Sequence, residues 1–309
     1  MALIIRVGAV RAQWWKEHMQ TLLPEIDCRL WDEPGDPDEI EYALVWKPPA
    51  GGLKKFINLK CIISMGAGID HVLADPELPK NIPIIRTTGN DLTQRMREYI
   101  CLHVLRHHRR LVEIEEGQKL KQWRQAVNPP ANERCVGIMG LGRLGRDAAR
   151  TLTAIGFDVR GWSRTAKDIP DVSCFDGHSG LIPFIERSEI LVCLLPLTVS
   201  TRRILNKNLF SKLPDGACLI NAARGEHLVD SDLLEALDEG VIDYATLDVF
   251  HTEPLPDSHP FWEHPRILIT PHVASLIDPV SGGKAIAENL RLFIKGEDVP
   301  DLVDLSQGY

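Results

Sequence analysis

Residues 135–145 read CVGIMGLGRLG, and this stretch decides the fold. The apolar run Cys135–Met139 predicts a buried strand, and the helical spacing of apolar residues that follows predicts a helix from about Leu144 to Ile155. A further apolar run, Phe157–Trp162, predicts the next strand. A strand, a glycine-rich turn, a helix and a second strand in this order are typical of a dinucleotide-binding βαβ unit.

The glycines of the turn have distinct physical roles. Gly140 allows the tight reversal, Gly142 lets the backbone approach a pyrophosphate, and Gly145 lets the helix pack closely on the strand. Free N–H groups and the dipole at the helix start attract phosphate. The alternative is a glycine-rich turn with a purely structural role. The residues expected to contact the dinucleotide here are Gly140, Leu141, Gly142, Arg143, Leu144 and Gly145.

Short apolar runs separated by helical patterns extend in both directions from this unit. Several are runs of Val, Ile and Leu without strict alternation, which is typical of parallel strands buried on both faces. The expected strands before the unit are Leu3–Val7, Ala43–Trp46, Cys61–Met65 and Ile82–Arg86, and those after it are Ile190–Leu195, Ala217–Asn221, Tyr244–Val249 and Ile267–Thr270. We therefore expect an α/β protein with a Rossmann-type doubly wound parallel sheet and a second, smaller α/β domain.

A long helical stretch, from about Leu92 to Arg110, connects the two series of strands. Another helix is expected from Asp230 or Ser231 to just before Gly240. The last helix ends at Gly296 and follows the final strand, so it can return to the first series. We place the smaller domain at residues 1–100 and 274–309, and the dinucleotide-binding domain at residues 101–273.

Composition narrows the functional classes. The 309 residues are 44% hydrophobic and 25% charged, which excludes disordered, collagen-like and disulfide-scaffold proteins. The formal net charge of −8 argues against a general affinity for nucleic acid or for an anionic membrane. No apolar run reaches the ~18–20 residues that span a bilayer, and the N-terminus lacks the features of a signal peptide. We therefore expect a cytoplasmic protein.

The seven cysteines are scattered, odd in number and without a Cys-x-x-Cys pair. We interpret them as small buried hydrophobic side chains in a reducing compartment rather than as metal ligands or redox pairs. No metal site is expected.

The end of the second strand of the unit distinguishes NAD from NADP. An NAD site carries an Asp or Glu there, about 20 residues after the turn, to bind the ribose hydroxyls. Asp158 fits the count but starts the strand, whereas Ser163, Arg164 and Thr165 follow its end. Two hydroxyls and a guanidinium suit a 2′-phosphate, so we expect NADPH as the preferred cofactor and NADH as a weaker one. The alternative is a solvated turn that happens to contain an arginine.

Three polar residues follow expected strands of the second series: Arg224, Glu253 and His272. Sites of open α/β sheets gather at the carboxyl ends of the strands. An arginine can hold a carboxylate and polarise the neighbouring ketone, and a histidine can protonate the developing alkoxide. A glutamate beside that histidine favours the imidazolium form. Each residue alone also suits an ordinary surface or loop position, and we interpret His107 and His108 as a solvated helix face.

The motifs of the chain resemble those of the D-isomer-specific 2-hydroxyacid dehydrogenase family, and in particular its NADPH-dependent branch that reduces glyoxylate and hydroxypyruvate. They occur in the order of the family over most of the chain. The matching stretches are residues 45–49 (VWKPP), 65–70 (MGAGID), 140–145 (GLGRLG), 162–165 (WSRT), 221–225 (NAARG), 247–250 (LDVF), 253–256 (EPLP) and 270–274 (TPHVA).

The resemblance implies a Rossmann-type domain with a flavodoxin-like substrate domain, and a cleft that reduces small 2-oxo acids with NADPH. It implies that Arg224, Glu253 and His272 are the catalytic residues. Asp248 would face the nicotinamide carboxamide. The substrate contacts would be Trp46, Ala67, Gly68 and Arg224, and the further cofactor contacts Leu195, Pro196 and Ala222. A homodimer formed through the nucleotide-binding domain is also implied, with the segment Leu111–Trp123 as a candidate part of its interface.

One segment departs from the family. The common pattern there is Asn-x-Pro-Gly before a helix, and this chain has Arg86-Thr87-Thr88-Gly89-Asn90. The preferred 2-oxo acid therefore stays open at this stage. A dehydrogenase for a bulkier D-2-hydroxy acid and a non-catalytic protein that senses dinucleotides are the alternatives.

Overall fold

The computed structural model describes residues 1–8, 11–125 and 127–304. The chain folds as two compact units, Met1–Leu92 with Ile277–Tyr309, and Thr93–Leu276. The first division, after Leu92, lies eight residues before the expected boundary, and the second, after Leu276, lies three residues after it. The shift at Leu92 has a physical reason, because helix α3 (Asn90–His108) packs its apolar side chains into the core of the second unit.

The first unit contains a five-stranded parallel sheet in the order β2-β1-β3-β4-β5. This is the flavodoxin-like order, so that part of the fold prediction is confirmed. Its strands are β1 (Ala2–Arg6), β2 (Asp27–Leu30), β3 (Ile40–Val45), β4 (Cys61–Ser64) and β5 (Ile84–Ile85).

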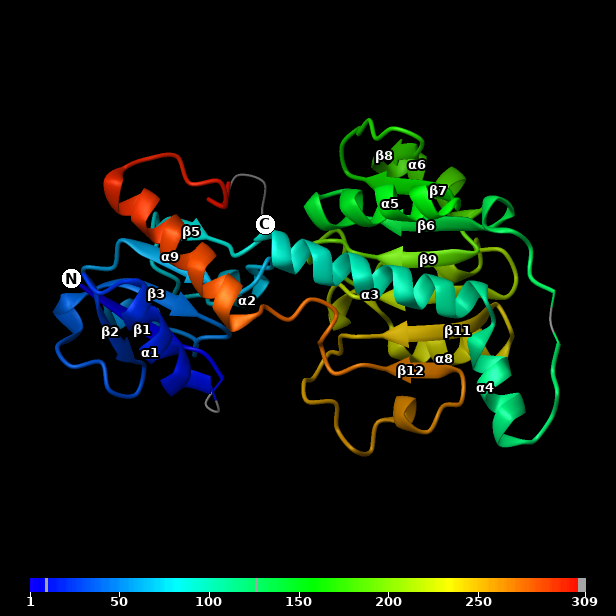
Figure 1. The fold of residues 1–309 in the computed structure, drawn as a ribbon, viewed down its shortest axis with the longest axis horizontal. Helices are drawn as coiled ribbons and strands as arrows, with labels where there is room; N and C mark the ends of the chain where they lie inside the picture. The colour runs from blue at the N-terminus through cyan, green and yellow to red at the C-terminus, as the bar shows by residue number, and fades with distance from the viewer. Residues whose placement is uncertain (9–10, 126, 305–309) are drawn as a thin grey trace. The chain divides into compact units, whose positions relative to one another are not determined.

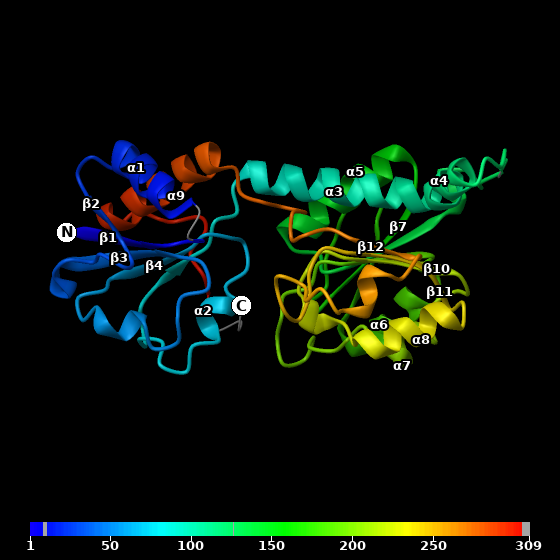
Figure 2. The same cartoon turned by 90° about the horizontal axis from the view of Figure 1, so that it is seen from below.

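Helices cover both faces of this sheet. On one face, α1 (Ala12–Leu22) and α9 (Pro279–Lys295) pack on side chains that include Leu3 and Ile5 of β1. On the other face, the intervening residues of β1 pack with Val72 of α2 (Asp70–Leu73). Figure 2 shows α1 and α9 on the face opposite α2.

The second unit contains a seven-stranded parallel sheet in the order β12-β11-β10-β9-β6-β7-β8. The order reverses between β6 and β9, as in a Rossmann-type sheet, which confirms the predicted class. The strands are β6 (Cys135–Met139), β7 (Asp158–Ser163), β8 (Ser173–Asp176), β9 (Ile190–Cys193), β10 (Ala217–Asn221), β11 (Ile242–Leu247) and β12 (Ile267–Ile269).

Two helical layers enclose this sheet (Figures 1 and 2). On one face α3 and α5 (Arg143–Ile155) share a buried cluster with β6 and β9. On the other face lie α6 (Gly177–Ile185), α7 (Lys207–Phe210) and α8 (Asp230–Asp238). The remaining helix, α4 (Leu111–Lys119), follows α3, and the short 3₁₀ turns are η2 (Pro37–Glu39), η3 (Leu53–Lys55), η4 (Ala131–Glu133), η5 (Gly225–His227) and η6 (Pro260–Trp262).

Two strands are absent from the sequence prediction, β2 and β8. Both lie at the edge of a sheet, are four residues long and mix polar with apolar side chains. Such short edge strands lack the continuous apolar run that marks a central strand. By contrast, the predicted helix ends at Ile155 and before Gly296 are confirmed, since Gly156 and Gly296 take φ values of 108° and 71° that end each helix.

The prediction that His107 and His108 form a solvated face is wrong. Both side chains are buried, because α3 lies flat on the sheet and its last turn packs on it. The His107 Nε2 lies 3.0 Å from the Thr246 Oγ1 on β11, and the His108 ring packs 5.0 Å from the ring of Phe157. Burial lowers the pKa of His107 to about 3.

The seven cysteines are free thiols, of which five are buried and Cys101 and Cys174 half-buried. Burial raises the pKa of the Cys193 thiol to about 12. The described helices include none with the length and apolarity that a bilayer span requires.

Candidate active site

The glycine-rich turn has a geometry that requires its glycines. Gly140 has a φ of 104°, and a Cβ there would lie 2.6 Å from the carbonyl oxygen of Leu194. A Cβ on Gly145 would lie 1.8 Å from the carbonyl oxygen of Gly140. By contrast, a Cβ on Gly142 would meet no protein atom within 4 Å. Open space therefore lies at the start of α5. The first N–H groups of a helix have no partner within the helix and favour an anion, and this fits a pyrophosphate.

The end of β7 differs in part from the expected phosphate site. Asp158 pairs with Cys135 at the far end of the strand, away from the glycine turn. The Ser163 hydroxyl is buried and donates a 2.8 Å hydrogen bond to the carbonyl oxygen of Thr165. Because that proton is used inside the turn, the exposed side chains of Arg164 and Thr165 are the better candidates for a 2′-phosphate.

The other expected cofactor contacts follow the neighbouring strands. Leu195 and Pro196 come after β9, and Ala222 comes directly after β10. The carbonyl oxygen of Pro196 accepts hydrogen bonds from the Thr201 hydroxyl at 2.7 Å and from His227 at 3.3 Å. The turn after β9 is thereby fixed next to the turn after β10.

Arg224 is held by its backbone at the end of β10. Its N–H donates to His227 Nδ1 at 3.2 Å, and its carbonyl oxygen accepts from Asn221 Nδ2 at 3.1 Å. Gly225 follows, where a Cβ would lie 2.0 Å from the carbonyl carbon of Phe250. The loops after β10 and β11 are therefore in close contact.

His227 is a residue that sequence reasoning missed. It is fully buried, and burial lowers its pKa. Because the carbonyl oxygen of Pro196 only accepts, the neutral ring carries its proton on Nε2, and Nδ1 accepts the hydrogen bond from Arg224 N–H. This ring links the Arg224 turn to the turn after β9.

Glu253 and His272 form an ion pair. His272 Nδ1 lies 2.9 Å from Glu253 Oε2, and Glu253 Oε1 accepts from the N–H of Phe250 at 3.2 Å. Because a carboxylate only accepts, His272 carries a proton on Nδ1 where it faces Glu253. The strands β10, β11 and β12 lie side by side and run parallel. Arg224, Glu253 and His272 therefore all follow the carboxyl ends of neighbouring strands.

Asp248 holds the turn that carries His272. We call Thr270–Ala274 the His272 turn. Asp248 is 1% exposed, and its Oδ1 accepts from Val273 N at 2.8 Å while its Oδ2 accepts from Ala274 N at 2.9 Å. Its carbonyl oxygen accepts from His272 N at 2.9 Å. Burial raises the pKa of this carboxyl, and the hydrogen bond from Thr270 opposes the shift most. The contact of Asp248 with a nicotinamide stays a prediction.

The expected substrate contacts Trp46, Ala67 and Gly68 belong to the first unit. There the Ser64 hydroxyl donates to the carbonyl oxygen of Gly68 at 2.9 Å and lies 3.1 Å from His71 Nε2. The His71 ring packs 4.5 Å from the Trp46 ring. Ser64 and His71 therefore join the Trp46 segment to the loop 66–70, and no motif in the sequence marks either residue.

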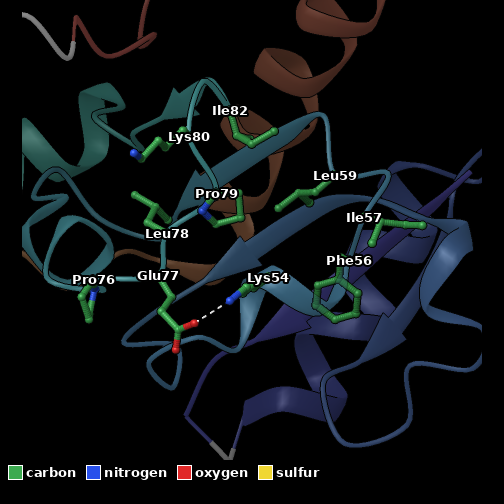
Figure 3. Close-up of a pocket in the computed structure, with 10 residues that line it drawn as sticks. All are labelled: Lys54, Phe56, Ile57, Leu59, Pro76, Glu77, Leu78, Pro79, Lys80 and Ile82. Carbon is green, nitrogen blue, oxygen red and sulfur yellow. Dashed lines mark hydrogen bonds and ion pairs between the residues drawn. The ribbon is translucent and has the colours of Figure 1, made fainter.

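The same unit has a separate hollow of about 430 Å³ beside η3 (Figure 3). Most of its walls are apolar, including Phe56 and Leu78, and Lys54 pairs with Glu77 at 2.7 Å. None of the predicted site residues lines it. Within residues 1–8, 11–125 and 127–304, no group of three or more His, Cys, Asp or Glu side chains is placed to hold a metal ion.

Comparison with known proteins gives a consistent result. Residues 101–274 match the model of the NAD binding domain of D-isomer specific 2-hydroxyacid dehydrogenases. The glyoxylate/hydroxypyruvate reductase A of Serratia proteamaculans is 41% identical over 303 residues, which covers 96% of each chain. The protein of the same name from Photorhabdus laumondii is 43% identical, with the same coverage.

Solved structures are similar along the whole chain. A D-isomer specific 2-hydroxyacid dehydrogenase from Xanthobacter autotrophicus, in complex with NADPH and MES, has a TM-score of 0.94 and 42% identity, covering 100% of this chain and 99% of that one. An NADPH-dependent glyoxylate/hydroxypyruvate reductase from Sinorhizobium meliloti, in complex with NADP and sulfate, has a TM-score of 0.91 and 37% identity, with the same coverage.

Proposed function

The chain belongs to the D-isomer-specific 2-hydroxyacid dehydrogenase family, and on this premise we propose that it reduces small 2-oxo acids with NADPH. The substrates are glyoxylate, which gives glycolate, and hydroxypyruvate, which gives D-glycerate. Support comes from two relatives that are named for this activity. Each of them aligns with 96% of this chain. The observation that carries the proposal is the 2.9 Å ion pair between Glu253 and His272 at the carboxyl edge of the sheet.

The proposed chemistry follows from the protonation of this pair. NADPH, when bound, supplies a hydride to the carbonyl carbon of the 2-oxo acid. His272 donates the proton on Nε2 to the carbonyl oxygen, so the C=O bond becomes CH–OH and the imidazolium becomes neutral. Glu253 accepts a hydrogen bond from Nδ1–H throughout, the proton stays on Nδ1, and the carboxylate stabilises the charged ring before the transfer. Arg224 binds the carboxylate of the substrate and polarises the ketone beside it.

The cofactor proposal rests on space and charge. The open space beside Gly142 would take the pyrophosphate at the N-terminus of α5, where the helix dipole favours an anion. Arg164, with Thr165, binds the 2′-phosphate, and no carboxylate follows β7 directly to repel it. Two of the similar structures contain NADPH or NADP. We therefore propose NADPH as the preferred cofactor, with NADH as the weaker one.

In this proposal the second unit binds the dinucleotide, and the first unit contributes the substrate contacts Trp46, Ala67 and Gly68. The N–H groups of a loop rich in glycine suit a carboxylate, because backbone donors in such turns form anion sites. A cytoplasmic location is part of the same proposal. It is supported by seven free thiols, which a reducing compartment preserves.

A substrate panel tests the function. Purified protein is mixed with NADPH or NADH and with glyoxylate, hydroxypyruvate or phenylpyruvate, and cofactor oxidation is followed by absorbance. We expect the highest kcat/KM with NADPH and one of the two small acids. A higher value with phenylpyruvate would identify a dehydrogenase for bulkier acids, and binding of NADPH without oxidation in any mixture would identify a dinucleotide sensor.

We also propose that the protein is a homodimer in which α4 and the segment after it form part of the interface. Apolar side chains are exposed there, with Leu120 at 54% and Trp123 at 91%. Figure 1 shows that α4 lies at one end of its unit, beyond the ends of the strands. Light scattering should give twice the chain mass for the wild-type protein and the mass of one chain after Leu120→Lys with Trp123→Lys. A wild-type monomer would contradict the proposal.

A further inference from the structure

Hydrogen bonds connect helix α3 to the His272 turn through the core of the second unit. The hydroxyl of Tyr99, on α3, lies 2.8 Å from the Thr270 Oγ1, and Thr270 Oγ1 lies 2.6 Å from Asp248 Oδ1. The same Asp248 oxygen accepts from Val273 N at 2.8 Å. Tyr99 is 9% exposed and Asp248 is 1% exposed, so the contacts lie largely out of water.

The direction of these bonds follows from their chemistry. A carboxylate only accepts, so the Thr270 hydroxyl must donate its single proton to Asp248. The Tyr99 hydroxyl must then donate to the Thr270 oxygen. Each hydroxyl therefore donates to the next group, from Tyr99 to Thr270 and from Thr270 to Asp248. Burial raises the pKa of Tyr99 and keeps this phenol protonated, so it remains a donor.

The bonds end on a strained piece of backbone. His272 has a φ of 53°, a left-handed conformation that non-glycine residues adopt rarely. The N–H groups of His272, Val273 and Ala274 all donate to Asp248, one to its carbonyl oxygen and two to its carboxylate. A carboxylate free to rotate would release the last two bonds, so its orientation decides whether the turn keeps its conformation.

We propose that Tyr99 and Thr270 are positioning residues that fix the Asp248 carboxylate and thereby hold the His272 ring against Glu253. This inference rests on the proposed role of His272 as the proton donor. Neither residue needs to touch substrate or cofactor, because their effect passes through Asp248. The Tyr99 ring is itself fixed, since it packs 4.2 Å from the ring of His103 on the next turn of α3.

Two substitutions remove one hydroxyl each at nearly constant volume, Tyr99→Phe and Thr270→Val. The first measurement is hydrogen exchange of the amides of Val273 and Ala274 in the protein without ligands. We expect faster exchange in both variants, with the larger increase for Thr270→Val, since it removes the bond to the charged group. Thr270→Ser, which keeps the hydroxyl, should restore slow exchange.

The second measurement is kinetic. The Tyr99→Phe variant should lose about threefold to tenfold in kcat and Thr270→Val about 10- to 100-fold, in line with hydrogen bonds to neutral and charged partners. The solvent deuterium isotope effect on kcat should rise in both, because a misplaced His272 slows proton transfer.

Tyr244→Phe is the matched control, since it removes a tyrosine hydroxyl from the same unit beside His107. Exchange in Tyr99→Phe no faster than in this control would overturn the proposal, and so would faster exchange with an unchanged kcat. If none of the 2-oxo acids led the wild-type protein to oxidise NADPH, the proposed function would be wrong. The exchange rates would then still decide whether Tyr99 and Thr270 hold the turn.

Discussion

The glycine turn at residues 140–145 and the His272 turn both follow strands of one parallel sheet, yet they reach their backbone conformations by opposite means. The first depends on absent side chains, because a Cβ at Gly140 or Gly145 would collide with backbone oxygens. The second keeps a non-glycine residue at a φ of 53° by three hydrogen bonds to Asp248. The comparison teaches that the proposed anion site depends on accessible backbone, whereas the proposed proton donor depends on a side chain held in place.

The largest expected effect concerns the His272 turn. His272→Ala removes the proposed proton donor and should lower kcat by about 10²–10⁴, the usual contribution of general acid catalysis. NADPH binding should be retained, because the glycine turn is untouched, and fluorescence titration measures it. Turnover close to that of the wild-type protein would exclude His272 from this role.

A substitution in the glycine turn should have the opposite effect and weaken the binding of NADPH. Gly142→Ala places a methyl group where no protein atom lies within 4 Å, so the fold should keep its stability. The methyl group would meet the pyrophosphate, and the Kd for NADPH should rise about 5- to 150-fold, as for steric overpacking of about 1–3 kcal/mol.

Gly145→Ala is the matched variant, because its Cβ would lie 1.8 Å from the carbonyl oxygen of Gly140. It should lower the free energy of unfolding as well as the affinity for NADPH. Equal thermal stability of the two variants would show that the turn is less constrained than the structure indicates.

Arg164→Asp sharpens the comparison at the end of β7, where a side chain rather than the backbone is expected to bind phosphate. The ratio of kcat/KM with NADPH to kcat/KM with NADH should fall by about 10- to 100-fold, because a charge-assisted bond is replaced by repulsion. Ser163→Ala should change this ratio less, since its hydroxyl donates to Thr165. An unchanged ratio in Arg164→Asp would remove Arg164 from the phosphate site.

The smallest expected effect concerns a buried histidine of α3. The pKa of His107 falls from 6.5 to about 3 on folding, so the unfolded chain binds the extra proton between these values. Its contribution to stability is therefore complete above pH 6.5 and is lost as the pH falls, by about 2 kcal/mol at pH 5. Urea unfolding at pH 7 and pH 5 should show a smaller pH dependence in His107→Gln. The same dependence in both proteins would contradict this origin.

The sequence predicted local features better than distant contacts. The glycine turn is encoded within eleven consecutive residues, and the central strands by continuous apolar runs, so both were found. Short edge strands such as β2 lack that signal. The positions of His107 and Tyr99 depend on how α3 lies on the sheet, which the pattern of the helix alone does not encode.

The candidate site shows the same division. Arg224, Glu253 and His272 were selectable because polar residues after buried strands gather at one edge of a parallel sheet. Their supports were not, since Tyr99 and Thr270 are 171 residues apart in the chain. Asn221 ends β10 and Thr270 directly follows β12, and this position at the end of a strand is the signal that could have identified them. His227 and His71 had no such signal.

The most direct test of the central claim uses NADPH with deuterium at the transferable position of the nicotinamide. The protein is incubated with this cofactor and hydroxypyruvate, and the product is analysed by mass spectrometry and chiral chromatography. We expect D-glycerate with one deuterium on carbon 2 for each NADPH oxidised. Glycerate without deuterium, or NADPH left unoxidised, would contradict it.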